Sequence, residues 1–489
     1  MVGKQDIRVR IAPSPTGHLH LGTVRTALYN YLFAQKEHGT FILRVEDTDQ
    51  GRSLPIYENE ILDGLRALGL TWQEGPDVGG PYGPYRQTER TQIYKTYIEK
   101  LLTERKAYYC FCTKEDLEKQ REAMLVEGIA PKYAGTCRSL SAQQVQEKLA
   151  AGASSVIRLL VSDGVEVSFD DVIRGSISVM SNTIGDMVIA KNVNTPLFHL
   201  ANVVDDYEMK ISHVIRGEDH ISNTPKQILI QQALGFPRVR YAHIPLVLTP
   251  DRKKMSKRSL ETSFVEYLHD GYLPEALLNF LALLGWAPED GSELLTLPEM
   301  VERFSLKRIQ KSGAAFNIDK LDWFNAQYIK KLSFAELVQR LTPFVPPEWL
   351  LQNNHLMEHA INLERERIKK LSDFVEGAGF LFSLGEYETS LLVWKGSTLA
   401  QASAHLAKIR ELLDSIEPSN FTATYLESVI MPYAQQVGRG EVLWPLRVAL
   451  SGKQNSPGPF DILAALGKEE SLRRIDIGVA KVAGELSLS

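Results

Sequence analysis

The sequence predicts an α/β domain that is interrupted by an insertion and followed by helical domains. Strand and helix signals alternate over the first hundred residues, break off from about residue 110 to 194, and then resume. Beyond about residue 330 strand signals are few and helical periodicity dominates. Alternation of strand and helix is typical of a parallel sheet covered by helices, and 489 residues are too many for one hydrophobic core.

The first quarter of the chain carries the clearest elements. Apolar residues alternate with polar ones from Ile7 to Ile11, as in a strand, and a Pro/Gly loop and an amphipathic stretch follow. The expected elements here are strands at 7–11 and 40–46 and helices at 23–35, 56–68 and 91–104.

The interruption has a different character. Short β-like runs at 155–161, 176–180 and 187–190 surround a polar, helix-prone segment, which indicates an inserted α+β region. The α/β pattern then resumes with a strand at 211–216, a helix at 224–234 and an apolar strand at 243–248.

Composition places the protein among soluble globular chains. Hydrophobic residues make up 44% and charged residues 24%, and the net charge of −5 gives no global sign of nucleic-acid binding. Three cysteines provide no disulfide framework, and the charged N-terminus lacks the apolar core of a signal peptide. We therefore expect a cytoplasmic protein with no membrane or DNA partner.

The strongest motif runs from Arg10 to Thr23 (RIAPSPTGHLHLGT), between a predicted strand and a predicted helix. This placement directs the amides of a helix N-terminus at an anionic ligand. Gly17 and Gly22 permit close approach of the backbone, and His20 is suited to donate to a phosphate oxygen. A bare His-x-Gly is more often a structured loop, but the whole string in this context indicates a nucleotide site.

A second motif, Lys253 to Arg258 (KKMSKR), follows the apolar strand at 243–248. Several cations on one loop suit a phosphate chain that gains charge during reaction. Alone, such a run is more often a solvated basic loop. In a doubly wound sheet, however, loops at the carboxyl ends of strands converge on one ligand, so the two motifs are expected to act together.

These two strings resemble the signature motifs of class I aminoacyl-tRNA synthetases, with Thr23 in place of the final histidine of the first. Further matches point to the bacterial glutamyl-tRNA synthetase family and cover nearly the whole chain. They are RVEDTD at 44–49, GPYRQTER at 83–90, HLANVVDD at 199–206, VIRGEDH at 214–220, WPLR at 444–447 and PGPFDILAALG at 457–467.

The resemblance implies a Rossmann-like class I catalytic domain with an α+β insertion, followed by all-α anticodon-binding domains. The implied segments are catalytic halves at 1–109 and 198–250, an acceptor-stem-binding insertion at 110–197, a stem-contact region at 251–330, and anticodon-binding domains at 331–393 and 394–489. It also implies a monomer with tRNA(Glu), L-glutamate and ATP with Mg²⁺ as partners.

The same resemblance assigns roles to residues. Catalysis is expected of His20, Lys254 and Lys257, and ATP binding of His20, Gly22, Asp219, His220 and Lys257. Glutamate binding is expected of Arg10, Ala12, Ser14, Glu46, Phe198, Asn202 and Arg216. Two carboxylates and one ammonium require two cations and one anion, which the two arginines and Glu46 supply. Phe198 stands where the family usually has Tyr, so one hydroxyl contact is missing.

Three cysteines in the insertion, Cys110, Cys112 and Cys137, resemble a zinc site of some family members. Three thiolates suit zinc, but a structural site has four ligands and the usual fourth position is Ser139. Tyr133 is a poor substitute, so zinc and inert cysteines both remain open, with the missing ligand weighing slightly against zinc.

The C-terminal helices resemble the anticodon-binding part of bacterial glutamyl enzymes. Arg367 matches the position at which members restricted to glutamate tRNA carry arginine, and Arg447 and Ser456 are further candidates for tRNA contact. For these three residues a solvated helix surface is the alternative. For the whole chain, the alternatives are another nucleotidyltransferase and a non-catalytic RNA-binding paralogue, and the cations at 20, 254 and 257 argue against the second.

Overall fold

The computed structural model describes residues 6–128, 131–249, 251–253, 263–352 and 354–487. The chain divides into two compact units, the first comprising residues 1–268 and 274–318 and the second residues 269–273 and 319–489. Among the described helices, none is both long and apolar enough to cross a membrane.

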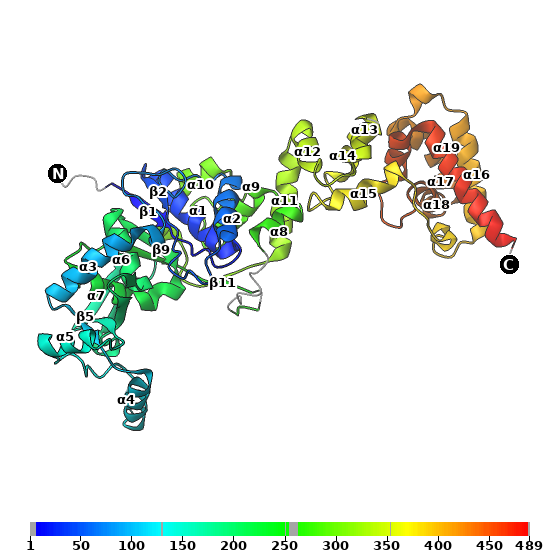
Figure 1. The fold of residues 1–489 in the computed structure, drawn as a ribbon. Coiled ribbons are helices and arrows are strands. Elements are labelled where there is room, and N and C mark those ends of the chain that lie inside the picture. The colour runs from blue at the N-terminus through cyan, green and yellow to red at the C-terminus, as the bar shows by residue number, and fades with distance from the viewer. Residues whose placement is uncertain (1–5, 129–130, 250, 254–262, 353, 488–489) are drawn as a thin grey trace. The chain divides into compact units, whose positions relative to one another are not determined.

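The first unit is built on parallel strands. Strand β1 (Arg8–Ile11) pairs in parallel with β2 (Thr40–Leu43), and helix α1 (Leu21–Lys36) connects them and packs on both (Figure 1). Parallel bridges from Ile42 to Glu74 and from Val45 to Arg86 extend the sheet beyond β2. On the other side of β1 lies β9 (His213–Gly217), followed by the parallel strand β10 (Arg240–Ile244).

This strand order reverses direction at β1. From β1 the chain moves outward to β2 and the Glu74 segment, and it later returns to the opposite side of β1 to form β9 and β10. A reversal of this kind is the topological switch point of a doubly wound sheet, where ligands bind beyond the carboxyl ends of the strands. The predicted α/β class is therefore confirmed.

Helices cover both faces of this sheet. Alternate strand residues point to opposite faces, and Ile42 and Val214 belong to a core shared with α3, α6 and α7, whereas α1 packs on β1, β2 and β9 together with α9 and α10. The helices are α2 (Pro55–Ala67), α3 (Thr91–Thr103), α6 (Phe198–Glu208), α7 (Thr224–Leu234), α8 (Phe264–His269), α9 (Pro274–Leu283) and α10 (Leu297–Arg303).

The insertion contains more strands than the sequence predicted. Its antiparallel sheet has the order β3 (Ala107–Cys110), β4 (Val156–Leu159), β7 (Val188–Asn192) and β8 (Thr195–Pro196). A hairpin of β5 (Glu166–Asp171) and β6 (Gly175–Met180) joins β10 through β5. Helices α4 (Lys114–Val126) and α5 (Ala142–Ala150) begin at capping boxes of Thr113 and Ser141.

Two predicted strands are wrong in extent. The strand expected at 243–248 is divided, because Pro245 has no N–H for the ladder; β10 ends at Ile244 and β11 (Val247–Leu248) pairs instead with β12 (Ala314–Ala315). The regular strand expected to reach Glu46 ends at Leu43, although the amides of Arg44 and Glu46 still donate to the carbonyls of Ile11 and Pro13.

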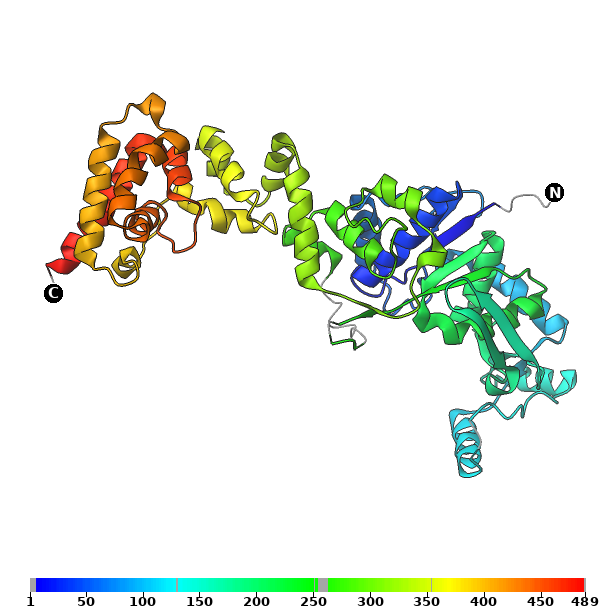
Figure 2. The same cartoon turned by 180° about the vertical axis from the view of Figure 1, so that it is seen from behind.

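The described part of the second unit is entirely helical (Figure 2). Its helices are α11 (Ile318–Lys331), α12 (Phe334–Leu341), α13 (Pro347–Gln352), α14 (Asn354–Glu364), α15 (Asp373–Phe382), α16 (Leu399–Asp414), α17 (Ala423–Val437), α18 (Arg439–Ser451) and α19 (Pro459–Leu486). Helix α19 packs on α16 and α18 and breaks at Gly467, whose φ of 75° favours glycine. The predicted helical C-terminal half is confirmed.

Candidate active site

The predicted nucleotide motif lies at the switch point of the sheet. The loop from Ala12 to His20 leaves the carboxyl end of β1 and enters α1, and the short 3₁₀ helix Glu218–Asn223 leaves the carboxyl end of β9. Ser14 and Asp219 are exposed on these two loops, and Ala12 and His220 are half-buried. Two segments about two hundred residues apart in the chain therefore lie at the same edge of the sheet, beyond the carboxyl ends of β1 and β9.

His20 is held at the N-terminus of α1. Its Nδ1 accepts a hydrogen bond of 3.2 Å from the amide of Thr23, so the ring caps the helix while remaining exposed. A side chain at position 22 would place its Cβ 3.2 Å from His20 Nδ1, so glycine there lets the ring keep this position. The imidazole is therefore fixed beside the helix amides and accessible to an anionic ligand.

A buried network of charges lies behind this loop. Arg10 contacts Asp206 through two hydrogen bonds of 3.0 and 3.4 Å. Arg44 is fully buried and joins Asp206 at 2.8 Å, Glu46 at 3.0 Å and Asp205 at 3.7 Å. The charges of Arg10 and Arg44 outweigh the effect of burial and hold the pKa of Asp206 below its usual value, so this carboxylate is ionised.

Arg216 is the exception in this region. It is buried, yet no carboxylate contacts it among the described residues; its Nε donates to His243 Nε2 at 3.2 Å and its Nη2 to Thr224 Oγ1 at 2.7 Å. Burial, together with the charge of Arg10, lowers the pKa of Arg216 to about 10. At neutral pH it is therefore a buried cation without a direct counter-ion, which is costly unless a ligand supplies the anion.

The remaining pocket residues come from helix α6. The amide of Asn202 donates to Glu46 Oε1 at 2.8 Å, and Gln227 donates to Asn202 Oδ1 at 3.1 Å. Phe198, at the first turn of α6, has its ring 6.0 Å from the ring of His220. The structure thus joins the predicted Arg10, Glu46 and Asn202 through one hydrogen-bonded network, and the charges of Arg10 and Glu46 act on the nearby Arg216.

The second motif is covered only at its beginning. Lys253 forms an ion pair of 3.0 Å with Asp251, and Lys254 and Lys257 lie outside the described residues.

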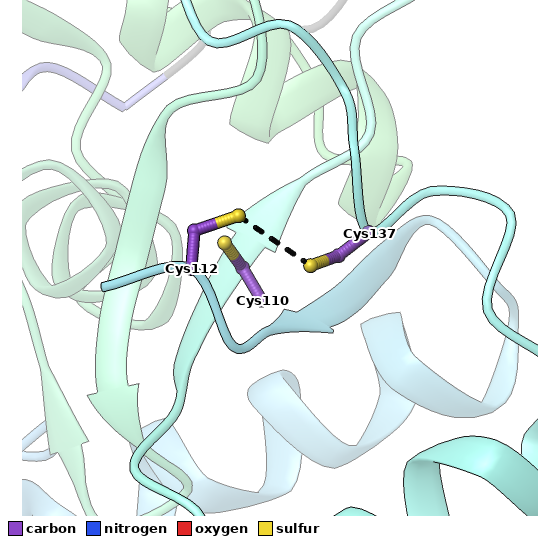
Figure 3. Close-up of side chains that lie close together, drawn as sticks. All are labelled: Cys110, Cys112 and Cys137. Atoms are coloured by element: carbon purple, nitrogen blue, oxygen red, sulfur yellow. Dashed lines mark hydrogen bonds between the residues drawn. The ribbon is translucent and has the colours of Figure 1, made fainter. Parts of the chain in front are cut away.

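The three cysteines of the insertion converge (Figure 3). Their sulfur atoms lie within 4.8 Å of one another, and the Sγ atoms of Cys112 and Cys137 are 3.7 Å apart. The hydroxyl of Tyr133 lies 3.3 Å from Cys110 Sγ and 3.5 Å from Cys112 Sγ. Burial raises the pKa of Cys110, but hydrogen bonds from Tyr133 and Arg158 outweigh it and hold the pKa below its usual value.

The tRNA candidates lie in the second unit. Arg367 is exposed and pairs at 3.3 Å with Glu364, and burial of Glu364 raises the pKa of that carboxyl. Arg447 lies over the ring of Trp444 and donates to the carbonyl of Gln454, and burial together with the nearby charge of Arg367 lowers its pKa. Ser456 is buried.

Sequence reasoning assigned no role to several residues that hold this site together. These buried charged or polar side chains are Arg44 directly after β2, Asp205 and Asp206 in α6, and His243 in β10. The only available signal was a charged residue within or beside an apolar run, and such a residue is equally compatible with an exposed position.

The fold and the site together define a doubly wound α/β domain that carries a loop at a helix N-terminus and a buried arginine near its switch point, in a chain with a second, helical unit. Residues 6–323 match the family described as tRNA synthetases class I (E and Q), catalytic domain, and residues 336–479 match the anticodon binding domain. The chain belongs to this class I family of tRNA synthetases.

Individual relatives agree along the whole chain. A protein of Carboxydothermus hydrogenoformans named glutamate–tRNA ligase is 43% identical, with 96% of this chain and 99% of the relative covered. Glutamate–tRNA ligase 2 of Caldicellulosiruptor saccharolyticus is 40% identical, with 96% and 98% covered. The crystal structure of a glutamate tRNA ligase from Elizabethkingia meningosepticum in complex with its amino acid is 35% identical, with a TM-score of 0.89 and coverage of 97% and 99%.

Proposed function

We propose that this protein is a glutamate–tRNA ligase. It activates L-glutamate with ATP to glutamyl-adenylate and transfers the glutamyl group to the 3′ end of tRNA(Glu). The observation that carries the choice of amino acid is Arg216, a buried guanidinium with no carboxylate contact among the described residues. A substrate carboxylate supplies the missing anion, which a neutral amide does not.

The pocket matches the charges of glutamate. Arg216 binds one carboxylate with its free edge, and Arg10 lies close enough to depress the pKa of Arg216 and to assist the other. Glu46, whose Oε1 accepts hydrogen bonds from Arg44 and Asn202, accepts hydrogen bonds from the ammonium group of the substrate. Ala12, Ser14 and Phe198 complete the walls of this pocket.

ATP binds across the carboxyl ends of β1 and β9. His20, Gly22 and the α1 amides receive the phosphates, and Asp219 and His220 approach the nucleotide from the opposite loop. The glutamate carboxylate attacks the α-phosphate and pyrophosphate leaves, so charge builds up on the phosphate oxygens. His20, Lys254 and Lys257 stabilise this charge, and Mg²⁺ enters with ATP.

Amino-acid-dependent exchange of pyrophosphate into ATP tests the proposal, with tRNA present so that a requirement for it does not hide activation. Glutamate supports exchange, and kcat/KM for glutamine and for aspartate is expected to be at least about a hundredfold lower. The side-chain amide of glutamine leaves the buried cation unpaired, and the shorter side chain of aspartate does not reach it. Exchange that depends equally on glutamine contradicts the assignment of the pocket.

Replacing His20 with alanine is expected to lower kcat of exchange about a hundredfold, since it removes one donor to the developing phosphate charge. The KM for glutamate changes little, because His20 lies outside the glutamate pocket. His18→Ala is the matched control: His18 lies two residues away on the same loop, is exposed and pairs with Glu60. Equal losses in both variants exclude a specific role for His20.

The second unit reads the anticodon in this proposal, through Arg367, Arg447 and Ser456. An arginine beside unstacked bases supplies planar hydrogen bonds and stacking. Arg367→Ala is expected to reduce discrimination between glutamate and glutamine tRNA about tenfold, as for loss of one bidentate base contact. Arg410→Ala, at an exposed arginine paired with Asp476 in the same unit, leaves discrimination unchanged. If Arg367→Ala leaves the ratio of kcat/KM for the two tRNAs unaltered, this role of Arg367 is contradicted.

The cysteine cluster fits a structural zinc ion. Tetrahedral zinc with bonds of about 2.3 Å to sulfur separates two sulfurs by about 3.8 Å and a sulfur from an oxygen by about 3.6 Å. The observed 3.7 Å between Cys112 and Cys137 and 3.3 and 3.5 Å to the Tyr133 hydroxyl agree with such edges. We therefore assign the fourth position to Tyr133, in place of Ser139. Zinc held by these residues would cross-link the end of β3 to the segment at 133–137.

Purified protein is expected to contain about one zinc per chain, and Cys112→Ser or Tyr133→Phe to lower that content, measured by plasma mass spectrometry. Tyr109→Phe, next to Cys110 on strand β3, is the control and keeps the metal. Protein that binds no zinc when expressed and dialysed with the ion contradicts the site.

The protein acts on tRNA(Glu), L-glutamate and ATP as a monomer in the cytoplasm, without DNA or a membrane. Each segment has its own part in this function. Activation of glutamate takes place in the catalytic halves at 1–109 and 198–250. The tRNA is bound by the acceptor-stem insertion at 110–197, the stem-contact region at 251–330 and the anticodon domains at 331–393 and 394–489.

A further inference from the structure

The hydrogen bonds of the Arg216 guanidinium to its neighbours occupy only one of its edges. Its Nε donates to His243 Nε2 and its Nη2 donates to Thr224 Oγ1, whereas Nη1 has no partner among the described residues. The edge formed by Nη1 and the second hydrogen of Nη2 therefore remains available. A guanidinium can bind a carboxylate through this edge with two parallel hydrogen bonds.

His243 is in turn held by Asp171. The Nδ1 of His243 lies 2.7 Å from Asp171 Oδ2, and the side chains of both residues are fully buried. Asp171 also accepts hydrogen bonds of 2.9 and 2.8 Å from the amides of Ile173 and Arg174. Burial raises the pKa of Asp171, but the hydrogen bonds from His243 and these amides outweigh it and lower the pKa, so the carboxylate is ionised.

These contacts fix the tautomer of His243. An ionised carboxylate only accepts, so Nδ1 carries the proton; a guanidinium only donates, so Nε2 presents its lone pair to Arg216. Burial, together with the positive charge of Arg216, lowers the pKa of His243 and keeps the ring neutral. A proton on Nε2 would set two donors against each other and release Arg216.

We propose that Asp171 and His243 are positioning residues that aim Arg216 at the substrate carboxylate. The three side chains come from neighbouring strands β5, β10 and β9, with His243 directly opposite Arg216 in the parallel register. The inference deepens the proposed function and rests on it for the identity of the carboxylate. It adds that the inserted hairpin, through Asp171, takes part in recognition of glutamate.

Two substitutions of His243 separate positioning from simple packing. His243→Gln keeps an acceptor near the position of Nε2, whereas His243→Asn keeps only the contact with Asp171. His243→Asn is expected to raise the KM for glutamate about tenfold or more, as for loss of a hydrogen bond to a charged group. The KM for ATP stays within about twofold, and His243→Gln recovers most of the affinity for glutamate.

Asp171→Asn provides a second variant, because its amide no longer holds the proton on Nδ1 and the KM for glutamate rises similarly. The matched control is His213→Asn, a buried histidine on β9 that contacts Ser212 at the opposite end of the strand. The proposal is overturned if His243→Asn leaves the KM for glutamate unchanged, or if His213→Asn raises it equally.

Nitrogen-15 NMR of histidine-labelled wild-type protein gives a readout that does not depend on activity. The expected His243 signals are those of a neutral ring with the proton on Nδ1 at pH 7, assigned by their absence in His243→Gln. A proton on Nε2 or a charged ring overturns the inference. Wild-type protein without glutamate-dependent exchange defeats the proposed function instead, so the two failures are distinguishable.

Discussion

Arg216→Gln is expected to lower kcat/KM for glutamate about a hundredfold or more. Truncation of one partner of a buried charge pair costs about 2–5 kcal/mol, and each 1.4 kcal/mol is a factor of ten. Arg216→Lys does not restore activity, because a single ammonium cannot form the two parallel bonds of a guanidinium edge. The loss falls on the KM for glutamate, and the KM for ATP is nearly unchanged.

The same substitution has an opposite consequence for the folded protein without substrate. Arg216 is a buried cation without a direct counter-ion among the described residues, so its removal is expected to leave the free energy of unfolding unchanged or to increase it. Arg240→Gln, at an exposed arginine that begins β10, is the control and affects neither quantity. An unchanged KM for glutamate in Arg216→Gln shows that the pocket is misassigned.

Arg44→Met is expected to destabilise the first unit by about 3–5 kcal/mol, the cost of removing one partner from a buried ion pair. Arg44 is fully buried and joins Asp206, Glu46 and Asp205, which would be left as buried carboxylates with fewer counter-charges. Burial lowers the pKa of Arg44, but these three carboxylates outweigh it and raise the pKa, so its charge is retained.

Hydrogen exchange of the β1 and β2 amides across a series of urea concentrations measures this effect in the first unit alone. Arg86→Met is the control: Arg86 is partly exposed, pairs with Glu58 and Glu89, and its loss is expected to cost about 1 kcal/mol or less. If Arg44→Met lowers the free energy of unfolding by no more than Arg86→Met does, the buried charge network contributes little to stability.

How far the sequence predicts the fold depends on the range of the contacts involved. The first strand and α7 (Thr224–Leu234) follow from local periodicity and are found where expected. Strand β5 does not follow from the local pattern, because its third inward residue is Asp171, and a carboxylate at that position is typical of an exposed face. Asp171 is buried because its side chain contacts His243 on β10, which is distant in sequence. Pro245 divides a run that looks continuous in hydropathy alone.

The site shows the same division. The motif around His20 is contiguous in sequence, so its place between β1 and α1 was predictable. The family resemblance predicted that Arg10 and Arg216 belong to the site, but it did not predict their different environments. Arg10 is hydrogen-bonded to Asp206, whereas no carboxylate among the described residues contacts Arg216. The sequence does not predict that the Tyr133 hydroxyl lies beside the cysteines, because that contact depends on the folded insertion. Partnership of this kind is a property of tertiary structure.

Charging of two transcripts, glutamate tRNA and glutamine tRNA, with labelled glutamate and ATP tests directly whether the protein is a glutamate–tRNA ligase. We expect glutamyl ester on the glutamate tRNA and little on the glutamine tRNA. Charging of both keeps the ligase and removes the discriminating role of Arg367. If folded protein charges neither competent tRNA, the proposed function is contradicted.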